Sequence, residues 1–439
     1  MKKIMLICLI AILLIGGCGV SQEQTEETVT LVIASFGDNR ELHEQAAIFN
    51  ENHTDYQIEI RQYFRYEQEE GDGIQKLQRE IVSGNGPDII NFGREYSVTD
   101  ILGEYTEDLS PYLANLSSEE EDVYFTNILE AFSYQDKLYA VPVSFTLHTY
   151  AGRSSVIGNR KSWTIEELMF CYQEELEKSE GSLMLYPGET KKDVFGSILT
   201  GSVESFVDWE ERTCSFDSSD FKKIMEFANQ FPDTLNITED FSPFQCYADG
   251  NALLYPLVLS SVYDVCKADL ILGEDAVYIG YPAEGEDGTV IDAMDLVLAI
   301  SMGCEHKEIA WEFISQFLSQ EYQNNITEGF PVCKTSLEAQ LKQGQIIEYI
   351  EDEEGKKTPA EKARVTFEGE APLSIYQITD KQAASLLQII EKTSVASAYN
   401  SRLHSILLQE IDGYFNGDKS LDETAEVIQR IVQIYVNEI

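Results

Sequence analysis

Two short segments of the chain each combine an aromatic ring with polar side chains, the mixture that binds a small polar ligand with an apolar face. The ring can stack on the ligand while the polar groups form hydrogen bonds with its hydroxyls. The alternative is that both rings only cap the core of a sheet while the charged groups are solvated. The candidate side chains in these segments are Phe36, Asp38, Asn39, Phe92, Arg94 and Glu95.

Trp209 is a further candidate, because it stands alone among polar residues in the stretch 207–212. An isolated indole in such a stretch serves either as a stacking platform for a ligand or as a residue packed against a sheet. The sequence leaves both interpretations open.

Motifs for covalent or metal chemistry are missing from the sequence. There is no Gly-x-Ser-x-Gly and no P-loop, and His43-Glu44 lacks the second histidine of a zinc protease because Ala47 takes its place. With 77 acidic residues, a carboxylate pair of the kind that a hydrolase uses arises by chance and supports nothing. No spacing of cysteines, histidines or aspartates matches a zinc or calcium site. We therefore expect a binding protein, not an enzyme, with no metal or cofactor.

The elements that position the first two segments form a β-α-β-α-β pattern. Residues 29–35 are a continuous apolar run, residues 42–49 carry a helical stripe, and residues 56–61 alternate. A second helix and a strand at 88–92 complete a pattern that predicts a parallel sheet covered by helices. Because parallel strands end at one edge of a sheet, the two candidate segments are expected to lie together there.

Later parts of the chain contain residues that indicate a domain crossing, the starts of helices and a loop. Pro142 interrupts a strand at 139–144 and indicates a crossing between domains. Capping boxes that begin at Thr164 and Ser420 predict helices. The charged segment 348–362 has few large apolar residues and reads as a mobile surface loop.

Composition limits the class of protein. The chain has 439 residues, enough for two domains, and 43% of them are hydrophobic, which fits a globular protein. Its formal net charge of −46 makes nucleic acid a poor partner, because the phosphate backbone would be repelled.

The N-terminus indicates export. Lys2 and Lys3 precede an apolar run at 4–15 that is too short to span a bilayer, and small residues lead to Cys18. This pattern resembles a bacterial lipobox, with a signal peptide at 1–17, a lipid on Cys18 and a polar tether at 18–28. Six other cysteines remain outside the leader, either as buried thiols or as disulfides, and the sequence does not choose.

The whole chain resembles the family 1 extracellular solute-binding proteins, the lipid-anchored receptors of bacterial carbohydrate-type ABC importers. No single motif decides this, but the order of the motifs does. They are the lipobox, Phe49-Asn50, 84–89, 108–113, 137–142, 162–168, 280–282, Ser301, 306–308, 310–314 and 329–332.

The resemblance implies a two-lobe α/β fold of the type II periplasmic-binding-protein kind, each lobe a mostly parallel sheet flanked by helices, with the ligand cleft between the lobes. By position, lobe 1 takes 29–143 and 279–318, and lobe 2 takes 144–278 and 319–439. Carried over in the same way, the sugar-stacking aromatic is Phe92, with polar partners at Asp38 and Glu95. Further implied contacts are Ser144, Tyr255 and Asp295. The Gly-x-Trp that the family often has is absent from residues 250–262, and Tyr255 is the nearest ring.

The function implied is capture of a sugar or oligosaccharide by hinge closure and its delivery to ABC transporter permease subunits. We expect a monomer on the extracytoplasmic face of the membrane, held there only by its lipid. Alternatives are a non-sugar solute, a sensor subunit for a membrane kinase, and, more distantly, an exported hydrolase.

Overall fold

The computed structural model describes most of the chain in eleven stretches. The predicted leader, Cys18, Arg94 and Glu95 lie outside them. The described residues are 28–63, 72–93, 105–116, 123–134, 136–180, 182–209, 211–235, 241–283, 288–352, 354–396 and 401–438.

A five-stranded sheet with order β2-β1-β3-β13-β6 forms the centre of the first lobe. The first three strands in the chain run parallel, as the sequence predicts, and β13 is antiparallel to both of its neighbours. The strands are β1 (Val29–Ser35), β2 (Tyr56–Gln62), β3 (Ile89–Asn91), β6 (Val141–Pro142) and β13 (Val297–Ile300). The helices of this lobe are α1 (Arg40–Asn52), α2 (Asp72–Val82), α4 (Ser110–Leu116) and α12 (Lys307–Gln316).

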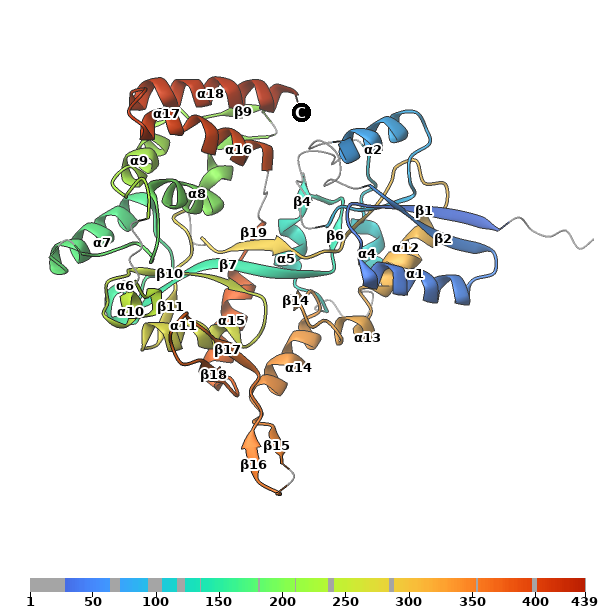
Figure 1. Cartoon of the computed structure of the whole chain (residues 1–439). Helices are drawn as coiled ribbons and strands as arrows, with labels where there is room; N and C mark the ends of the chain where they lie inside the picture. The colour runs from blue at the N-terminus through green and yellow to red at the C-terminus, as the bar shows by residue number, and fades with distance from the viewer. Residues whose placement is uncertain are drawn as a thin grey trace, which may run out of the picture.

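A six-stranded sheet forms the centre of the second lobe (Figure 1). The ten-residue strand β7 pairs antiparallel with four other strands, so the expectation of a mostly parallel sheet is wrong for this lobe. The strands are β7 (Ser144–Arg153), β10 (Leu254–Leu259), β11 (Ala276–Tyr278), β12 (Val290–Ala293), β14 (Phe330–Pro331) and β19 (Val395–Ala396).

Helices cover both faces of this second sheet, because successive side chains along its strands point to opposite faces. On β10, Leu257 and Leu259 enter one hydrophobic cluster while Leu254 enters another. The first cluster includes residues of α11 (Asp264–Leu272), α14 (Lys334–Gly344) and α15 (Asp380–Lys392), with α10 (Pro243–Ala248) beside them. The second includes residues of α7 (Ile165–Lys178), α8 (Lys191–Ser202), α9 (Ser219–Ala228), α16 (Ser401–Glu410), α17 (Asp412–Phe415) and α18 (Leu421–Glu438).

Short elements complete the fold. Both predicted capping boxes are present, at Thr164 with Glu167 and at Ser420 with Glu423. The segment predicted as a mobile loop contains a hairpin instead, β15 (Tyr349–Glu351) with β16 (Lys357–Pro359). The remaining elements are α5 (Thr126–Ala131), α6 (Ser154–Ile157), α13 (Gln320–Gln323), η2 (Val203–Phe206), β4 (Ser133–Tyr134), β5 (Lys137–Leu138), β8 (Val207–Asp208), β9 (Thr213–Cys214), β17 (Ala363–Val365) and β18 (Leu373–Ile375).

The chain crosses between the two sheets first at Val143 and Ser144, where β6 gives way to β7. The return that the resemblance placed at Ile279 comes later, in residues 294–296, because β12 still pairs with β7. Tyr281 also packs in the second cluster, which belongs to the second lobe. A third crossing lies between the end of α12 and β14.

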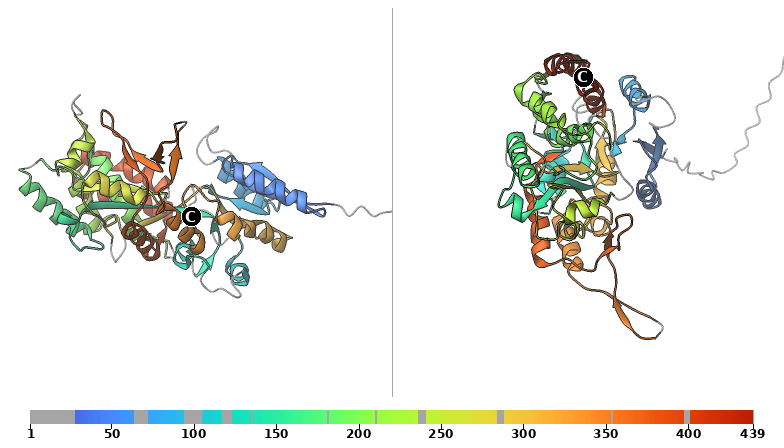
Figure 2. Two further views of the ribbon diagram at one scale, coloured as in Figure 1. Left: turned by 90° about the horizontal axis from the view of Figure 1, so that it is seen from below. Right: turned by 60° about the vertical axis from the view of Figure 1, so that its left-hand side comes forward.

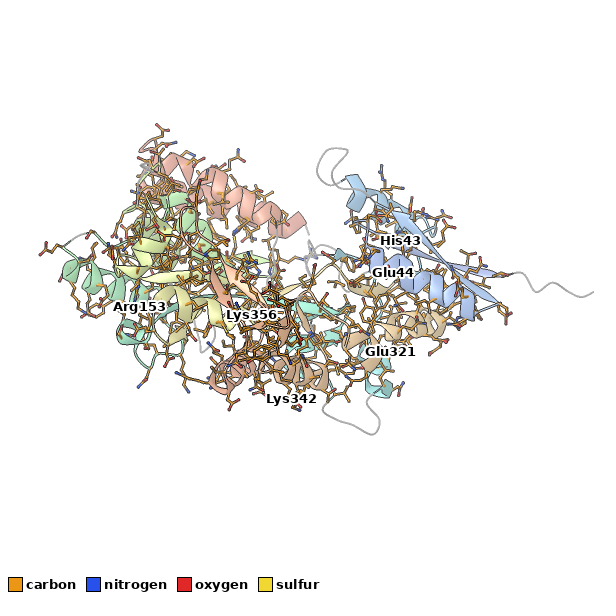
Figure 3. The ribbon with its side chains drawn as sticks, turned by 60° about the horizontal axis from the view of Figure 1, so that its bottom comes forward. His43, Glu44, Arg153, Glu321, Lys342 and Lys356 are labelled. Atoms are coloured by element: carbon orange, nitrogen blue, oxygen red, sulfur yellow. The ribbon has the colours of Figure 1, made fainter. Side chains whose placement is uncertain are left out.

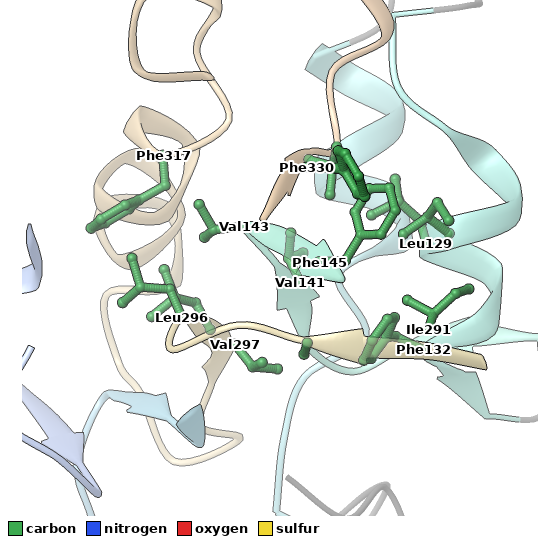
Figure 4. Close-up of a cluster of buried hydrophobic side chains, with 14 of the residues drawn as sticks. Leu129, Phe132, Val141, Val143, Phe145, Ile291, Leu296, Val297, Phe317 and Phe330 are labelled. Atoms are coloured by element: carbon green, nitrogen blue, oxygen red, sulfur yellow. The ribbon is translucent and has the colours of Figure 1, made fainter. Parts of the chain in front are cut away.

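Apolar side chains surround these crossings (Figure 4). Val143 and Leu296 lie on the crossing segments themselves, and the ring centroids of Phe145 and Phe330 are 5.7 Å apart. The first hydrophobic cluster therefore runs without a break from one sheet to the other. We call this region, with Val143, Phe145, Leu296, Phe317 and Phe330, the hinge core.

The side chain of Gln323 ties the hinge core together with hydrogen bonds. Its Nε2 donates to the carbonyl oxygens of Val143 (3.0 Å) and Phe317 (2.8 Å), and its Oε1 accepts from the amide of Cys333 (3.1 Å). The residue is fully buried, so each bond satisfies a group that water does not reach.

Among the described residues, no helix has the length and apolar character that a membrane span requires. The six described cysteines are free thiols.

A buried carboxyl, Glu189, lies in the second lobe among tyrosines that include Tyr150, Tyr172 and Tyr186. Its Oε1 accepts from the amide of Leu185 (2.8 Å), whereas Oε2 has no hydrogen-bond partner among the described residues. With 4% of its surface exposed, the group is desolvated, which raises its pKa to about 7.

Glu189→Gln is expected to stabilise the protein at pH 8 but not at pH 4.5. The raised folded-state pKa means that the carboxyl favours folding below its unfolded pKa, and this contribution is lost as the pH rises toward 7. The loss is on the order of 3 kcal/mol for a shift of this size. Urea unfolding between pH 4.5 and 8 measures it, with the exposed Glu174→Gln as control. Parallel pH profiles for wild type and Glu189→Gln would contradict the account.

Candidate functional site

The ends of β1 and β3 meet at one edge of the first sheet, as predicted. The two strands are parallel neighbours with Ser35 opposite Asn91, so Phe36 and Phe92 leave the sheet side by side. Both rings are buried, with 8% and 2% of their surface exposed, and both belong to the first hydrophobic cluster. In this structure they cap the core, which is the alternative that the sequence left open.

The polar residues after β1 have separate roles. Asn39 is the N-cap of α1, and its Oδ1 accepts from the amide of Leu42 (2.8 Å). Asp38 is exposed, and its Oδ1 lies 3.4 Å from Nε2 of His43 on the same helix. Figure 3 labels His43 and Glu44, the incomplete metal motif, on the surface of α1. Only Asp38 of this segment keeps a carboxylate open to a ligand.

Asn91 joins this edge to the second crossing between the lobes. Its Nδ2 donates to the carbonyl oxygen of Asp295 (3.2 Å), and its Oδ1 accepts from the amides of Gly93 (3.3 Å) and Val297 (3.0 Å). The structure therefore brings Asp295, whose side chain is exposed, to the edge that holds Phe92. The sequence analysis missed Asn91, although an amide inside the apolar strand 88–92 was a signal for it.

A cavity of about 490 Å³ lies where Tyr134 of the first lobe faces a hairpin of the second lobe. Trp209, at the turn of β8 and β9, lines this cavity, and so does the carboxylate-bearing Asp208. The volume falls within the range of sites for small ligands, roughly 300–1,000 Å³. The lining residues are Tyr134, Ser205, Phe206, Val207, Asp208, Trp209, Thr213, Cys214 and Ser215.

Helix α18 holds the cavity hairpin in place through two glutamines. Gln429 Nε2 donates to the carbonyl oxygen of Cys214 (2.8 Å), and its Oε1 accepts from the amide of Phe216 (2.7 Å). Gln433 Nε2 donates to the carbonyl oxygen of Arg212 (2.7 Å). Trp209 thus stands on a hairpin fixed by the C-terminal helix, a link of more than two hundred residues that the sequence pattern does not reveal.

The cavity is lined by uncharged groups and by one carboxylate, that of Asp208. Among its described lining residues, three carry aliphatic hydroxyls, Tyr134 carries a phenol, and none is a lysine, arginine or histidine. Burial raises the pKa of the Cys214 thiol to about 11, so this group is uncharged at neutral pH. Among the described residues, no group of histidine, cysteine and acidic side chains is placed to hold a metal ion.

Two of the residues implied by the resemblance lie elsewhere. Tyr255 packs edge-on against Tyr247, 5.4 Å between ring centroids, and burial raises its pKa to about 12. It shares the β10 face of Leu257, which belongs to the first cluster, whereas Trp209 packs against the second. Ser144 is a buried residue at the start of β7, in the hinge core. The structure does not bring either of them to the Trp209 cavity.

Comparison with known proteins gives one family and one fold. A model of the bacterial extracellular solute-binding proteins matches residues 44–351. There is no match among curated protein sequences.

Several solved structures share the fold at low sequence identity. The sugar-binding protein MalE from the phytopathogen Xanthomonas citri is 14% identical, with a TM-score of 0.59 over 93% of this chain and 98% of that one. The periplasmic oligogalacturonide binding protein from Yersinia enterocolitica is 15% identical, with a TM-score of 0.55 over 93% and 99%. The cyclic alpha-maltosyl-1,6-maltose binding protein from Arthrobacter globiformis is 13% identical, with a TM-score of 0.54 over 94% and 100%.

Gln429→Ala is expected to destabilise the protein by about 1–3 kcal/mol, because it leaves the Cys214 carbonyl and the Phe216 amide without their partner. Urea unfolding measures the loss. Glu426→Ala, an exposed change on the same helix, is the control. An equal loss in both variants would show that the helix, and not these two bonds, accounts for the effect.

Proposed function

Because the chain belongs to the bacterial extracellular solute-binding family, we propose that it captures a sugar or oligosaccharide between its two lobes and delivers it to an ABC transporter. Membership confirms the predicted family, and the shared fold confirms the two-lobe α/β architecture. The chain is a solute-binding protein that acts outside the cytoplasm. The solute class and the transporter are parts of the proposal.

The Trp209 cavity is the observation on which the proposal rests. A solute there would contact Tyr134 from the first lobe and Trp209 from the second, so its binding would favour the arrangement in which the lobes approach. The closed state is the form that a transporter would recognise.

The chemistry of this cavity favours a neutral sugar. The Trp209 indole presents an apolar face of the kind on which sugar C–H groups stack, and Asp208, Ser205 and Thr213 offer hydrogen bonds to hydroxyls. The names of the structurally similar proteins, one for a sugar, one for a cyclic maltosyl-maltose and one for oligogalacturonide, support a carbohydrate, and only the last of these ligands is charged.

The strand edge of the first lobe is a second contact region in this proposal. Asp38 and Asp295 are exposed residues there, and Phe92 of the same edge is buried in the core. Arg94 and Glu95 stay candidates from the sequence alone.

Attachment to the membrane rests on the lipobox in the sequence. We propose that the leader is cut before Cys18 and that a lipid on this cysteine holds a monomeric protein at the extracytoplasmic face. The support is the pattern Ile15-Gly16-Gly17-Cys18 together with the extracellular family.

Thermal unfolding of the mature protein against maltose, maltotetraose, oligogalacturonides, amino acids and peptides tests the proposal. A sugar at 100 times its Kd adds about 2.7 kcal/mol of stability and raises the melting temperature. Trp209→Ala is expected to weaken binding of that sugar by about 10- to 100-fold, the loss of roughly 1–3 kcal/mol of stacking.

Two controls accompany this measurement. Trp209→Phe keeps a ring and should retain most of the affinity, and Phe170→Ala removes an exposed ring on α7 without effect. A shift with amino acids or peptides alone would overturn the sugar class and keep the fold. Unchanged sugar affinity in Trp209→Ala would remove the cavity from the binding site.

A further inference from the structure

The hairpin of β15 and β16 projects away from the rest of the second lobe (Figures 1 and 2). All six of its strand residues are exposed. Two are large and apolar, Tyr349 and Ile350, with 58% and 61% of their surface exposed. Side chains of this kind at such exposure on a projecting element indicate a surface that contacts another molecule.

Hydrogen bonds order this hairpin at both ends. At the tip, Asp352 Oδ1 accepts from the amides of Glu354 (3.0 Å) and Lys356 (2.8 Å). At the base, the Ala360 amide donates to the Glu348 carbonyl oxygen (2.7 Å), and Lys362 forms an ion pair with the Glu348 carboxylate. These bonds fix the conformation of the hairpin, although two strands alone are only marginally stable in water.

The two edges of the hairpin differ in the main-chain groups that they present to another strand. Hydrogen bonds join residue 348 to 360 and residue 352 to 356, so the alternation of an antiparallel ladder turns the main-chain groups of Tyr349 and Glu351 outward. On β16 the outward positions are Lys357 and Pro359. Proline has no N–H to donate, and lysine and proline are typical residues of protected edges. Only the edge of β15 is open to another strand.

Charge is also divided between the two strands. Glu351, Asp352 and Glu354 lie on β15 and the start of the tip, whereas Lys356 and Lys357 lie on the side of β16. Figure 3 labels Lys356 on this hairpin. A strand that adds to β15 would lie on the side of the carboxylates. Lys357 Nζ is 3.8 Å from one oxygen of Glu351, an exposed pair that is open to exchange with a basic side chain of the added strand.

We propose that the β15 edge is a docking site for an extended, basic segment of a partner protein, which pairs with the main chain of Tyr349 and Glu351 as a third strand. Apolar side chains of the segment would cover Ile350 and Tyr349, and basic ones would meet Glu351 and Asp352. A second copy of this chain fits less well, because a net charge of −46 on each copy opposes association. This site lies beyond the solute-binding role and does not depend on it.

Fluorescence anisotropy with a labelled peptide of alternating valine and lysine tests the proposal on the mature protein. The salt concentration is held near 0.15 M, where the Debye length of about 8 Å limits non-specific attraction. Tyr349→Pro removes the outward N–H of β15 without breaking a ladder bond. Its control is Lys357→Pro, which removes the outward N–H of β16 and also removes the Lys357 charge that is paired with Glu351, a loss that does not weaken attraction of a basic peptide. Thermal unfolding checks that both variants remain folded.

The expected result is binding that weakens about tenfold or more in Tyr349→Pro, stays within about twofold in Lys357→Pro, and is lost with the glutamate version of the peptide. No binding to wild type, or an equal loss in both proline variants, would overturn the proposal. A concentration-dependent dimer that disappears in Tyr349→Pro would also overturn it, because the edge would then belong to a second copy. None of these outcomes alters the thermal shifts with sugars, so the two proposals fail separately.

Discussion

The hinge core is the constraint on which the rest of the structure depends. In the part of the chain that the structure describes, three crossings join the two sheets, and apolar side chains such as Val143, Leu296 and Phe330 pack around them as one continuous cluster. Two amide side chains fix the backbone there, Gln323 at the first and third crossings and Asn91 at the second. Since a buried unpaired amide is costly, these bonds select one path for the chain through the hinge.

The geometry of the Trp209 cavity depends on this arrangement. Tyr134 stands on the β4–β5 hairpin, where the Leu138 carbonyl oxygen accepts from the amide of Leu109, just before α4 of the first lobe. Trp209 sits on a hairpin tied to α18 through Gln429. The two rings therefore belong to different lobes, which the crossings of the hinge core join. A solute that contacts both would couple its binding to the relative position of the lobes.

Local patterns predicted the first sheet well, because the apolar run of β1 and the alternation of β2 are set by near neighbours in sequence. Local patterns could not decide whether Phe92 packs in the core or contacts a ligand. They also could not decide toward which face of the second sheet Tyr255 points. Tyr134 and Asn91 were missed because their roles come from segments far away in the chain, such as Asp295 for Asn91. The hairpin at 348–362 was missed because strands of three residues carry no detectable period.

Small-angle X-ray scattering of the mature protein, with and without the sugar that gives the largest thermal shift, tests the central claim most directly. If a solute is held between lobes that pivot on the hinge core, its saturation reduces the radius of gyration, and Trp209→Ala abolishes that change at the same sugar concentration. A radius of gyration that stays constant while the sugar is bound would contradict closure and place the binding site within a single lobe.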